Sequence, residues 1–354
     1  MGSSFLDDPA ALSAPGARTM LSLAGATGTQ LQEGFDLGRS SPDLPSAEGL
    51  RAVALAGMGG SGIAGDIVRA LYLDRLGTPI VVLKGQVLPE FCGRDTLVLA
   101  SSFSGNTEET IAIYTEAVAR GCRTVAISSG GELASLSEAD LVPYVQLPAE
   151  VPMPRAALGY LVGVPLGVLA AMGEIPPVQD SVAEAAGLLN RLANGLGPDA
   201  SLESNEAKRL ATWFEDRTPV VWGSEGLAEA AALRWKTQFN ENAKGPAWAS
   251  VLPELDHNEI EGWSHGRGSG FAAVVLRHPG EHPRFSDRIE ATIEAAAPSG
   301  LEIRQARAHG DRPLEWLFSL IMLGDYTSIY LAIERSVDPL PIPVLTGLKE
   351  RLRQ

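Results

Sequence analysis

A stretch rich in hydroxyl side chains, residues 101–110 (SSFSGNTEET), has the composition of an anion-binding loop. It follows an apolar run, residues 96–100, that predicts a buried parallel strand, and it precedes a helical pattern that starts at Glu108. Hydroxyl and backbone N–H groups then converge at a helix N-terminus, where the helix dipole favours an anion such as a phosphate ester. An ordinary capped turn fits the same stretch, because Ser, Thr and Asn are also common N-cap residues.

A second loop upstream is rich in glycine. Residues 57–62 (GMGGSG) follow the apolar run 52–56, and their glycines allow a ligand to approach the backbone closely. A dinucleotide-binding fold uses a similar loop, but it also needs an acidic residue at the end of the next strand. That strand ends at Lys84, which disfavours NAD.

Together, the GMGGSG and SFSGNT loops resemble those of the sugar isomerase (SIS) family. The resemblance implies a flavodoxin-like sandwich around a parallel sheet, in which both loops hold the phosphate of a phosphosugar. The loops alone do not name a reaction, since SIS domains also serve as sensors. The phosphate contacts that the resemblance implies are Gly60, Ser61, Ser102, Ser104 and Thr107.

Strand and helix patterns alternate along residues 50–147, which predicts a doubly wound α/β fold. The pattern restarts at residues 218–222, so the chain looks internally duplicated. In the second copy the loop after residues 271–276 reads RHPGEHP and has no hydroxyl pattern, which predicts one phosphate site per chain. An amphipathic helix is expected over residues 20–37. The expected divisions are an N-terminal helical extension (1–46), a first SIS domain (47–178), a second SIS domain (179–340) and a C-terminal helix (341–354).

Several residues have the chemistry that isomerisation of an aldose to a ketose requires, namely a base, a group that opens the sugar ring and positive charge for the enediolate. Glu241 (in NENAK), His257 (in ELDHNEI), Arg155 and Lys349 are the candidates. Each also has an ordinary explanation. Glu241 could be a solvated surface carboxylate and His257 a hydrogen-bonded loop residue. Lys349 could complement a helix dipole, and Arg155 could bond its own helix or a nearby carboxylate.

A metal site is a rival interpretation of the segment around His257. Its ligands would be Asp256, His257, Glu259, Glu261 and His265. The two histidines are eight positions apart and the segment contains no H-x-x-x-H pair, so the spacing disfavours a metal site.

The later motifs are more specific than the glycine loops. Two SIS-like domains with PRAALG, NENAK, ELDHNEI and a closing LKERL resemble the bifunctional phosphoglucose/phosphomannose isomerase branch of the family over residues 50–354. The resemblance implies Glu241 as the base for the C1/C2 proton, His257 as ring opener or hydroxyl-handling group, Arg155 near the enediolate and Lys349 assisting ring opening. It also implies a homodimer whose histidine reaches the partner's site, and it implies no cofactor or metal.

One position departs from the family pattern. Family members commonly carry a threonine in a D-P-T-P stretch that is thought to admit either epimer, whereas this chain has Leu340 there. Two other readings stay open: a non-catalytic phosphosugar sensor, and an isomerase of another phosphosugar, such as arabinose 5-phosphate or an amino sugar. The base candidates favour an enzyme, because a sensor needs the phosphate loops but no base.

Composition limits the partners and the compartment. The formal net charge is −15 with no basic tract, which argues against nucleic acid or an anionic membrane as partner. Cys92 and Cys122 are the only cysteines, so no disulfide framework is expected. The N-terminus is acidic and lacks the apolar segment of a signal peptide, and apolar runs such as residues 158–172 fall short of a membrane span. We therefore expect a cytoplasmic protein, and the family resemblance implies that it binds a phosphorylated hexose.

Overall fold

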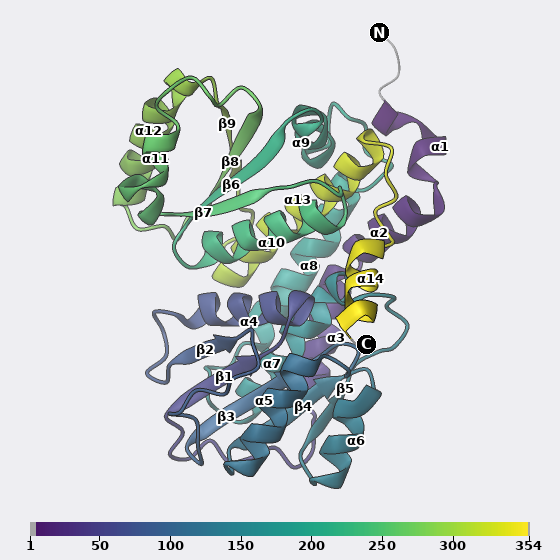
Figure 1. Cartoon of the computed structure of the whole chain (residues 1–354), viewed down its shortest axis with the longest axis vertical. Helices are drawn as coiled ribbons and strands as arrows, with labels where there is room; N and C mark the ends of the chain where they lie inside the picture. The colour runs from purple at the N-terminus through teal and green to yellow at the C-terminus, as the bar shows by residue number, and fades with distance from the viewer. Residues whose placement is uncertain (1–4, 353–354) are drawn as a thin grey trace. The chain divides into compact units, whose positions relative to one another are not determined.

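The computed structural model describes residues 5–352 of the chain (Figure 1). They form two compact units, each of which collects segments that are far apart in sequence. The predicted domains, with boundaries after residues 46, 178 and 340, are continuous stretches of sequence, whereas the two units are defined by contacts. The predicted boundaries therefore stay a prediction. Unit 1 contains residues 5–25, 191–309 and 319–352, and unit 2 contains residues 26–190 and 310–318.

The N-terminal region is helical, but the single helix expected over residues 20–37 is wrong. The structure has α2 (Pro15–Gly25) and α3 (Thr27–Arg39) with a break at Ala26, preceded by η1 (Phe5–Asp7) and α1 (Pro9–Leu12). Helix α2 belongs to unit 1 and α3 to unit 2. Both helices have a buried apolar face, and the helical spacing of the buried residues continues across Ala26. Periodicity alone therefore predicts one helix.

The sheet of unit 2 is parallel throughout, with the strand order β2-β1-β3-β4-β5. This is the flavodoxin-like order, in which ligands bind outside the carboxyl ends of the strands at the β1/β3 switch point. The predicted doubly wound fold is therefore confirmed. The strands are β1 (Ala52–Ala56), β2 (Ile80–Leu83), β3 (Thr96–Ser101), β4 (Arg123–Ser128) and β5 (Tyr144–Gln146).

Helices cover both faces of this sheet, because successive strand residues point to opposite sides. On one face, Ile113 of α5 packs with Ala54 and Val98. On the other face, Gly65 of α4 lies against Leu55. The helical elements of unit 2 include α4 (Gly59–Tyr72), α5 (Glu108–Ala119), α6 (Gly131–Ala139), η2 (Pro154–Ala156) and α7 (Leu158–Ala171), followed by α8 (Gln179–Leu196), which continues into unit 1.

Glycines allow α3 and α7 to pack with their backbones in contact. A Cβ atom on Gly38 would lie 2.2 Å from the carbonyl oxygen of Val164, and one on Gly167 would lie 2.2 Å from that of Phe35. Glycine inside a helix costs about 0.5–1 kcal/mol relative to alanine. The close packing of the two helices offsets that cost. Gly34, Gly159 and Gly163 meet the facing backbone in the same way.

The sheet of unit 1 repeats this arrangement with the parallel order β7-β6-β8-β9. Counted from its own first strand, that order is 2-1-3-4, which matches unit 2 and confirms the internal duplication. The sequence analysis missed β7, a short strand that begins with an exposed tryptophan. The strands are β6 (Thr218–Ser224), β7 (Trp248–Leu252), β8 (Phe271–Arg277) and β9 (Glu302–Arg307).

The long helix α13 corrects the expectation that every apolar run is shorter than a membrane span. It runs over Pro313–Glu334, 22 residues, and is apolar enough to cross a membrane, yet 94% of its most apolar window is buried within the protein. Such burial is typical of a core helix. The other helical elements of unit 1 are α9 (Glu206–Phe214), α10 (Leu227–Glu241), η3 (Glu254–His257), α11 (Glu259–Gly262), α12 (Arg284–Ala296), η4 (Ala297–Ser299) and α14 (Pro343–Leu352).

We expect Gly38→Ala to destabilise the protein, because the new methyl group must displace the α7 backbone at Val164. Overpacking of this kind costs about 1–3 kcal/mol. Gly195→Ala in α8 is the matched control, since no atom lies within 4 Å of a Cβ there and alanine favours a helix. Urea unfolding should show a loss for the first variant and no loss for the second. Equal effects would show that the α3/α7 approach does not constrain the fold.

Candidate active site

The glycine-rich loop of unit 2 leads into α4 without a side-chain cap. The N-cap residue Met58 makes no side-chain hydrogen bond to the helix, so the first N–H groups of α4 are not satisfied by a cap. Gly57 lies against β3, because a Cβ there would be 2.9 Å from the carbonyl oxygen of Ser101. The two predicted phosphate loops therefore meet at the switch point of the sheet. Ser61 is buried in the first turn of α4.

The hydroxyl loop after β3 is held in shape by its own contacts. Ser102 Oγ donates to Thr107 Oγ1 over 2.8 Å, and the Asn106 side chain donates to the Ser104 carbonyl over 3.1 Å. Gly105 has a φ of +70°, and a Cβ there would lie 1.7 Å from the carbonyl oxygen of Gly130. Only glycine fits that position. Thr107 is the N-cap of α5 but makes no side-chain cap bond, so this helix N-terminus also has no side-chain cap.

Two positively charged residues lie against glycines of the first loop, Arg155 through its backbone and Lys84 through its side chain. A Cβ on Gly60 would meet the backbone nitrogen of Arg155 at 3.1 Å, and Arg155 itself is 3% exposed. Lys84 forms an ion pair with Asp66 of α4, and its Cε lies 3.3 Å from the Cβ position of Gly62. Gly60 therefore has a packing role as well as its predicted one: its lack of a side chain lets α4 start beside Arg155. The sequence analysis considered Lys84 only as evidence against NAD.

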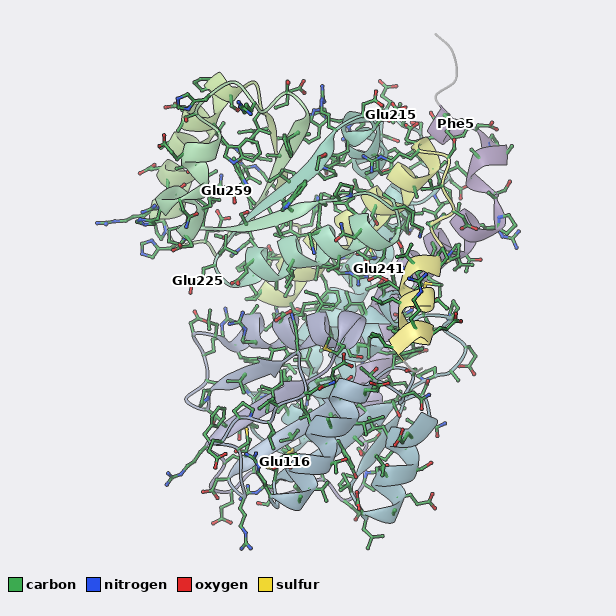
Figure 2. All side chains as sticks on the ribbon, viewed as in Figure 1. Phe5, Glu116, Glu215, Glu225, Glu241 and Glu259 are labelled. Carbon is green, nitrogen blue, oxygen red and sulfur yellow. The ribbon has the colours of Figure 1, made fainter. Side chains whose placement is uncertain are left out.

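Glu241 is the last residue of α10 in unit 1 and lines a cavity of about 640 Å³ between the end of α10 and the start of α14. Figure 2 shows Glu241 beside α14. Lys244, three residues further along, has a φ of +53°, and its ammonium group donates a hydrogen bond to the backbone carbonyl of Glu241. The other residues that line the cavity are Thr237, Asn240, Lys244, Gly245, Pro246 and residues 342–345.

Buried polar contacts fix the helix that carries Glu241. Arg234 of α10 makes a bidentate ion pair with Asp325 of α13, with both N···O distances at 2.9 Å. Asn242, just after the helix, donates to Ser328 Oγ over 2.9 Å. Asp325 and Ser328 were absent from the predicted set. The only sequence signal for them was a pair of polar residues within an apolar helix.

His257 lies at the end of η3 and is exposed. The residue before it is anchored, since the two carboxylate oxygens of Asp256 accept from Arg288 Nη1 and Thr292 Oγ1, both over 2.9 Å. This fastens the segment to α12 while the imidazole stays accessible to solvent. Lys349 is also exposed, on α14.

Glu259 is engaged by two tryptophans. Its Oε1 accepts from the indole N–H groups of Trp222 and Trp263, each over 3.2 Å. With Asp256 bonded to α12, two members of the rival metal set already have other partners. Within residues 5–352, no group of three His, Cys, Asp or Glu side chains is arranged to hold a metal ion.

The two cysteines are buried in unit 2 and are not activated nucleophiles. Burial raises the pKa of the Cys92 thiol, and it raises the pKa of Cys122 to about 11. Both thiols therefore stay protonated near neutral pH, and thiolate chemistry is disfavoured at either position.

Sequence comparison decides the family. A bifunctional phosphoglucose/phosphomannose isomerase from Caldicellulosiruptor bescii is 36% identical over 327 residues, which cover 92% of this chain and 96% of that protein. The chain belongs to the bifunctional phosphoglucose/phosphomannose isomerase family. The family model for the bacterial phospho-glucose isomerase C-terminal SIS domain matches residues 203–352. The predicted family is confirmed.

Two further comparisons bear on function and fold. A D-glucosamine-6-phosphate 4-epimerase from Sulfolobus acidocaldarius is 31% identical over 313 residues, covering 88% of this chain and 92% of that protein. The structure of tagatose-6-phosphate ketose/aldose isomerase from Escherichia coli matches with a TM-score of 0.66 at 14% identity, covering 94% of this chain and 96% of that one. That likeness supports the SIS fold alone.

The structure places the predicted residues of this family member in two sets. Unit 2 holds Arg155 and the loop residues, which it brings to one edge of its sheet. Unit 1 holds Glu241, His257 and Lys349. Glu241 borders the start of the helix that carries Lys349, whereas His257 lies in a separate segment anchored to α12. The predicted roles of all these side chains stay predictions.

We expect Asp325→Ala to destabilise the protein by about 3–5 kcal/mol, because it leaves the Arg234 guanidinium buried without its carboxylate. The double variant Arg234→Met with Asp325→Leu should recover most of that loss, since an apolar pair needs no charge partner. Denaturant unfolding measures both. A single variant as stable as the double one would contradict a structural role for the pair.

Proposed function

We propose that the protein interconverts glucose 6-phosphate, mannose 6-phosphate or both with fructose 6-phosphate through an enediolate. Glu241 carries this proposal, because it is a carboxylate at the edge of a cavity whose volume falls in the usual range for small-molecule sites. The names of the isomerase relatives support the substrate class. We also propose a cytoplasmic homodimer.

In this mechanism, unit 2 binds the phosphate. The hydroxyls of Ser61, Ser102, Ser104 and Thr107, with backbone N–H groups near Gly60, donate to the phosphate oxygens at two helix N-termini without side-chain caps. The helix dipoles add favourable electrostatics for the dianion. Local positive charge matters here because the net charge of the chain is −15.

The chemistry then needs three further groups. His257, assisted by Lys349, moves a proton between the ring oxygen and O1, which opens the sugar. Glu241 removes the proton from C2, so that the C2–H electrons form the C1=C2 bond of the enediolate while the C1=O1 π electrons move onto O1. It then returns the proton to C1, the C2–O2 bond becomes the carbonyl of the ketose, and the O2 proton passes to O1. Arg155 stabilises the negative charge on the enediolate oxygens, and its burial strengthens that interaction.

A second candidate within phosphosugar chemistry is favoured by the epimerase relative from Sulfolobus acidocaldarius, whose name specifies an amino sugar phosphate. Epimer choice is also open, because Leu340 stands in the D-P-L-P stretch, where its N–H donates to Asp338 Oδ1 over 2.9 Å. A coupled assay of fructose 6-phosphate formation from both hexose phosphates, with conversion of glucosamine 6-phosphate followed in parallel by NMR, distinguishes these outcomes. Binding without turnover of any of the three would favour the sensor.

We expect Glu241→Gln to lower kcat by about 10²- to 10⁴-fold with little change in KM, because the amide keeps the size of the side chain but cannot accept the carbon-bound proton. Glu259→Gln is the matched control, since an amide oxygen can still accept the two indole N–H groups. Turnover and exchange of the C2 hydrogen with deuterated water are measured for both variants. Normal exchange in Glu241→Gln would remove Glu241 from the mechanism.

Shared active sites in a homodimer make a further prediction. If His257 serves the site that contains the partner's Glu241, then His257→Asn and Glu241→Gln protomers should each be inactive alone and should regain activity when mixed. Random pairing restores one site in each mixed dimer, or about a quarter of wild-type activity. No recovery after co-refolding, with dimers verified by light scattering, would place both residues in the same protomer's site.

A further inference from the structure

A buried cluster of polar side chains occupies the carboxyl ends of β6 and β8 in unit 1. Ser224, Arg277 and His278 are 2%, 7% and 9% exposed, and the side chain of Glu281 is 8% exposed. None of these residues has a role in the proposed isomerisation. A buried charge at the carboxyl ends of these strands needs an explanation, because burying a charge is costly unless the charge is paired.

The carboxylate of Glu281 is surrounded by donors from both strand ends. Arg277 Nε donates to its Oε2 over 2.9 Å. Its Oε1 accepts longer bonds of 3.4 Å from Ser224 Oγ and from the backbone N–H of His278. A cation, a hydroxyl and a backbone N–H that converge on one group are the components of a phosphate site. Burial lowers the pKa of His278, so its ring is neutral at pH 7 and Arg277 supplies the positive charge.

The strand register places this cluster where unit 2 carries its phosphate loops. Ala56 of β1 pairs with Ala100 of β3, and Gly223 of β6 pairs with Leu276 of β8. Ser224 and Arg277 come directly after that last pair, as Gly57 and Ser101, where the loops of unit 2 begin, come directly after theirs. Both pairs of strands form the switch point of their sheet, the usual position for ligands in this fold.

The helix that follows the first strand of each sheet also begins differently in the two units. In unit 2, α4 has no side-chain cap. In unit 1, α10 begins after Gly226, whose N–H donates to Glu229 Oε2 over 3.2 Å. Two carboxylates of the chain therefore accept backbone N–H groups here, Glu229 at the start of α10 and Glu281 at the strand ends.

We propose that the switch point of unit 1 is an anion site that the chain closes with its own Glu281 carboxylate, and that removal of this carboxylate opens a site for inorganic phosphate or a phosphomonoester. Glu281 lies four residues after Arg277, so its contact with Arg277 is intramolecular and free phosphate must compete with a tethered carboxylate. The inference deepens the proposed function and rests on it in one respect, since it explains why a duplicated chain would hold one phosphosugar and not two.

Equilibrium dialysis of the full-length protein against inorganic phosphate tests this proposal. We expect Glu281→Ala to bind one more phosphate per chain than wild type, because the truncation empties the space between the donors. Glu281→Gln is the matched control: it removes the charge but fills the same volume, so it should gain no site. Adding Arg277→Gln to Glu281→Ala should abolish the extra site. A folded Glu281→Ala protein with the wild-type stoichiometry would overturn the proposal.

Folding of the alanine variant is a separate measurement. If Glu281→Ala is unstable because Arg277 is left unpaired, phosphate should raise its melting temperature more than chloride at equal ionic strength, and it should not do so when Arg277→Gln is added. Absence of that difference would also overturn the proposal. To distinguish failure of the proposed phosphate loops, the same dialysis uses Ser102→Ala with Thr107→Ala. That pair should remove the wild-type phosphate whether or not Glu281→Ala adds one.

Discussion

The reversal of strand order between two neighbouring parallel strands is the constraint on which both units depend. At this point the loops that follow the two strands run to opposite faces of the sheet. Backbone N–H groups and helix N-termini therefore lie at the carboxyl ends of the strands and need hydrogen-bond partners. The chain meets this need twice, at β1/β3 and at β6/β8, with opposite chemistry. Unit 2 surrounds the edge with hydroxyls and glycines that can receive an anion. Unit 1 supplies the anion itself, through Glu229 and Glu281.

This difference gives the duplication a physical meaning. An empty cradle of donors in a second domain would compete for phosphate and would leave buried donors unsatisfied whenever no ligand was bound. The Glu281 carboxylate, four residues after Arg277, satisfies these donors and keeps phosphate out. It also leaves unit 1 free to contribute α10, whose far end carries Glu241 and whose inner face is held by the Arg234–Asp325 pair. In the proposed mechanism, one copy of the fold provides the phosphate loops and the other provides the base.

Local patterns in the sequence were sufficient for the fold class, the two loops and the duplication, because buried parallel strands are short apolar runs followed by turn residues. They failed where distant contacts decide the outcome. The helix expected over residues 20–37 breaks at Ala26, since its two halves pack in different units. Strand β7 was missed because it is short and starts at an exposed Trp248. Glycine has a low intrinsic helix propensity, yet the glycines of α3 are the residues that allow α7 to approach.

The candidate site follows the same division. Motifs located Glu241 and the loop residues, but a single sequence holds no signal that Arg234 pairs with Asp325, 91 positions away. The structure also separates carboxylates that looked alike in sequence. Glu259 shares one oxygen between two indoles and the oxygens of Asp256 accept from α12, so protonating either would weaken packing contacts.

A general base must change protonation in every turnover, and a carboxylate that fastens a fold does so only at a cost to that fold. Glu241 borders a cavity, at the end of a helix that Arg234 and Asn242 anchor through buried polar contacts. These buried contacts fix α10 against α13 and so hold the residue at the end of α10 in place beside the cavity. A general base must be well positioned for its proton transfer, and this fixed support is the physical reason to propose Glu241 for that role.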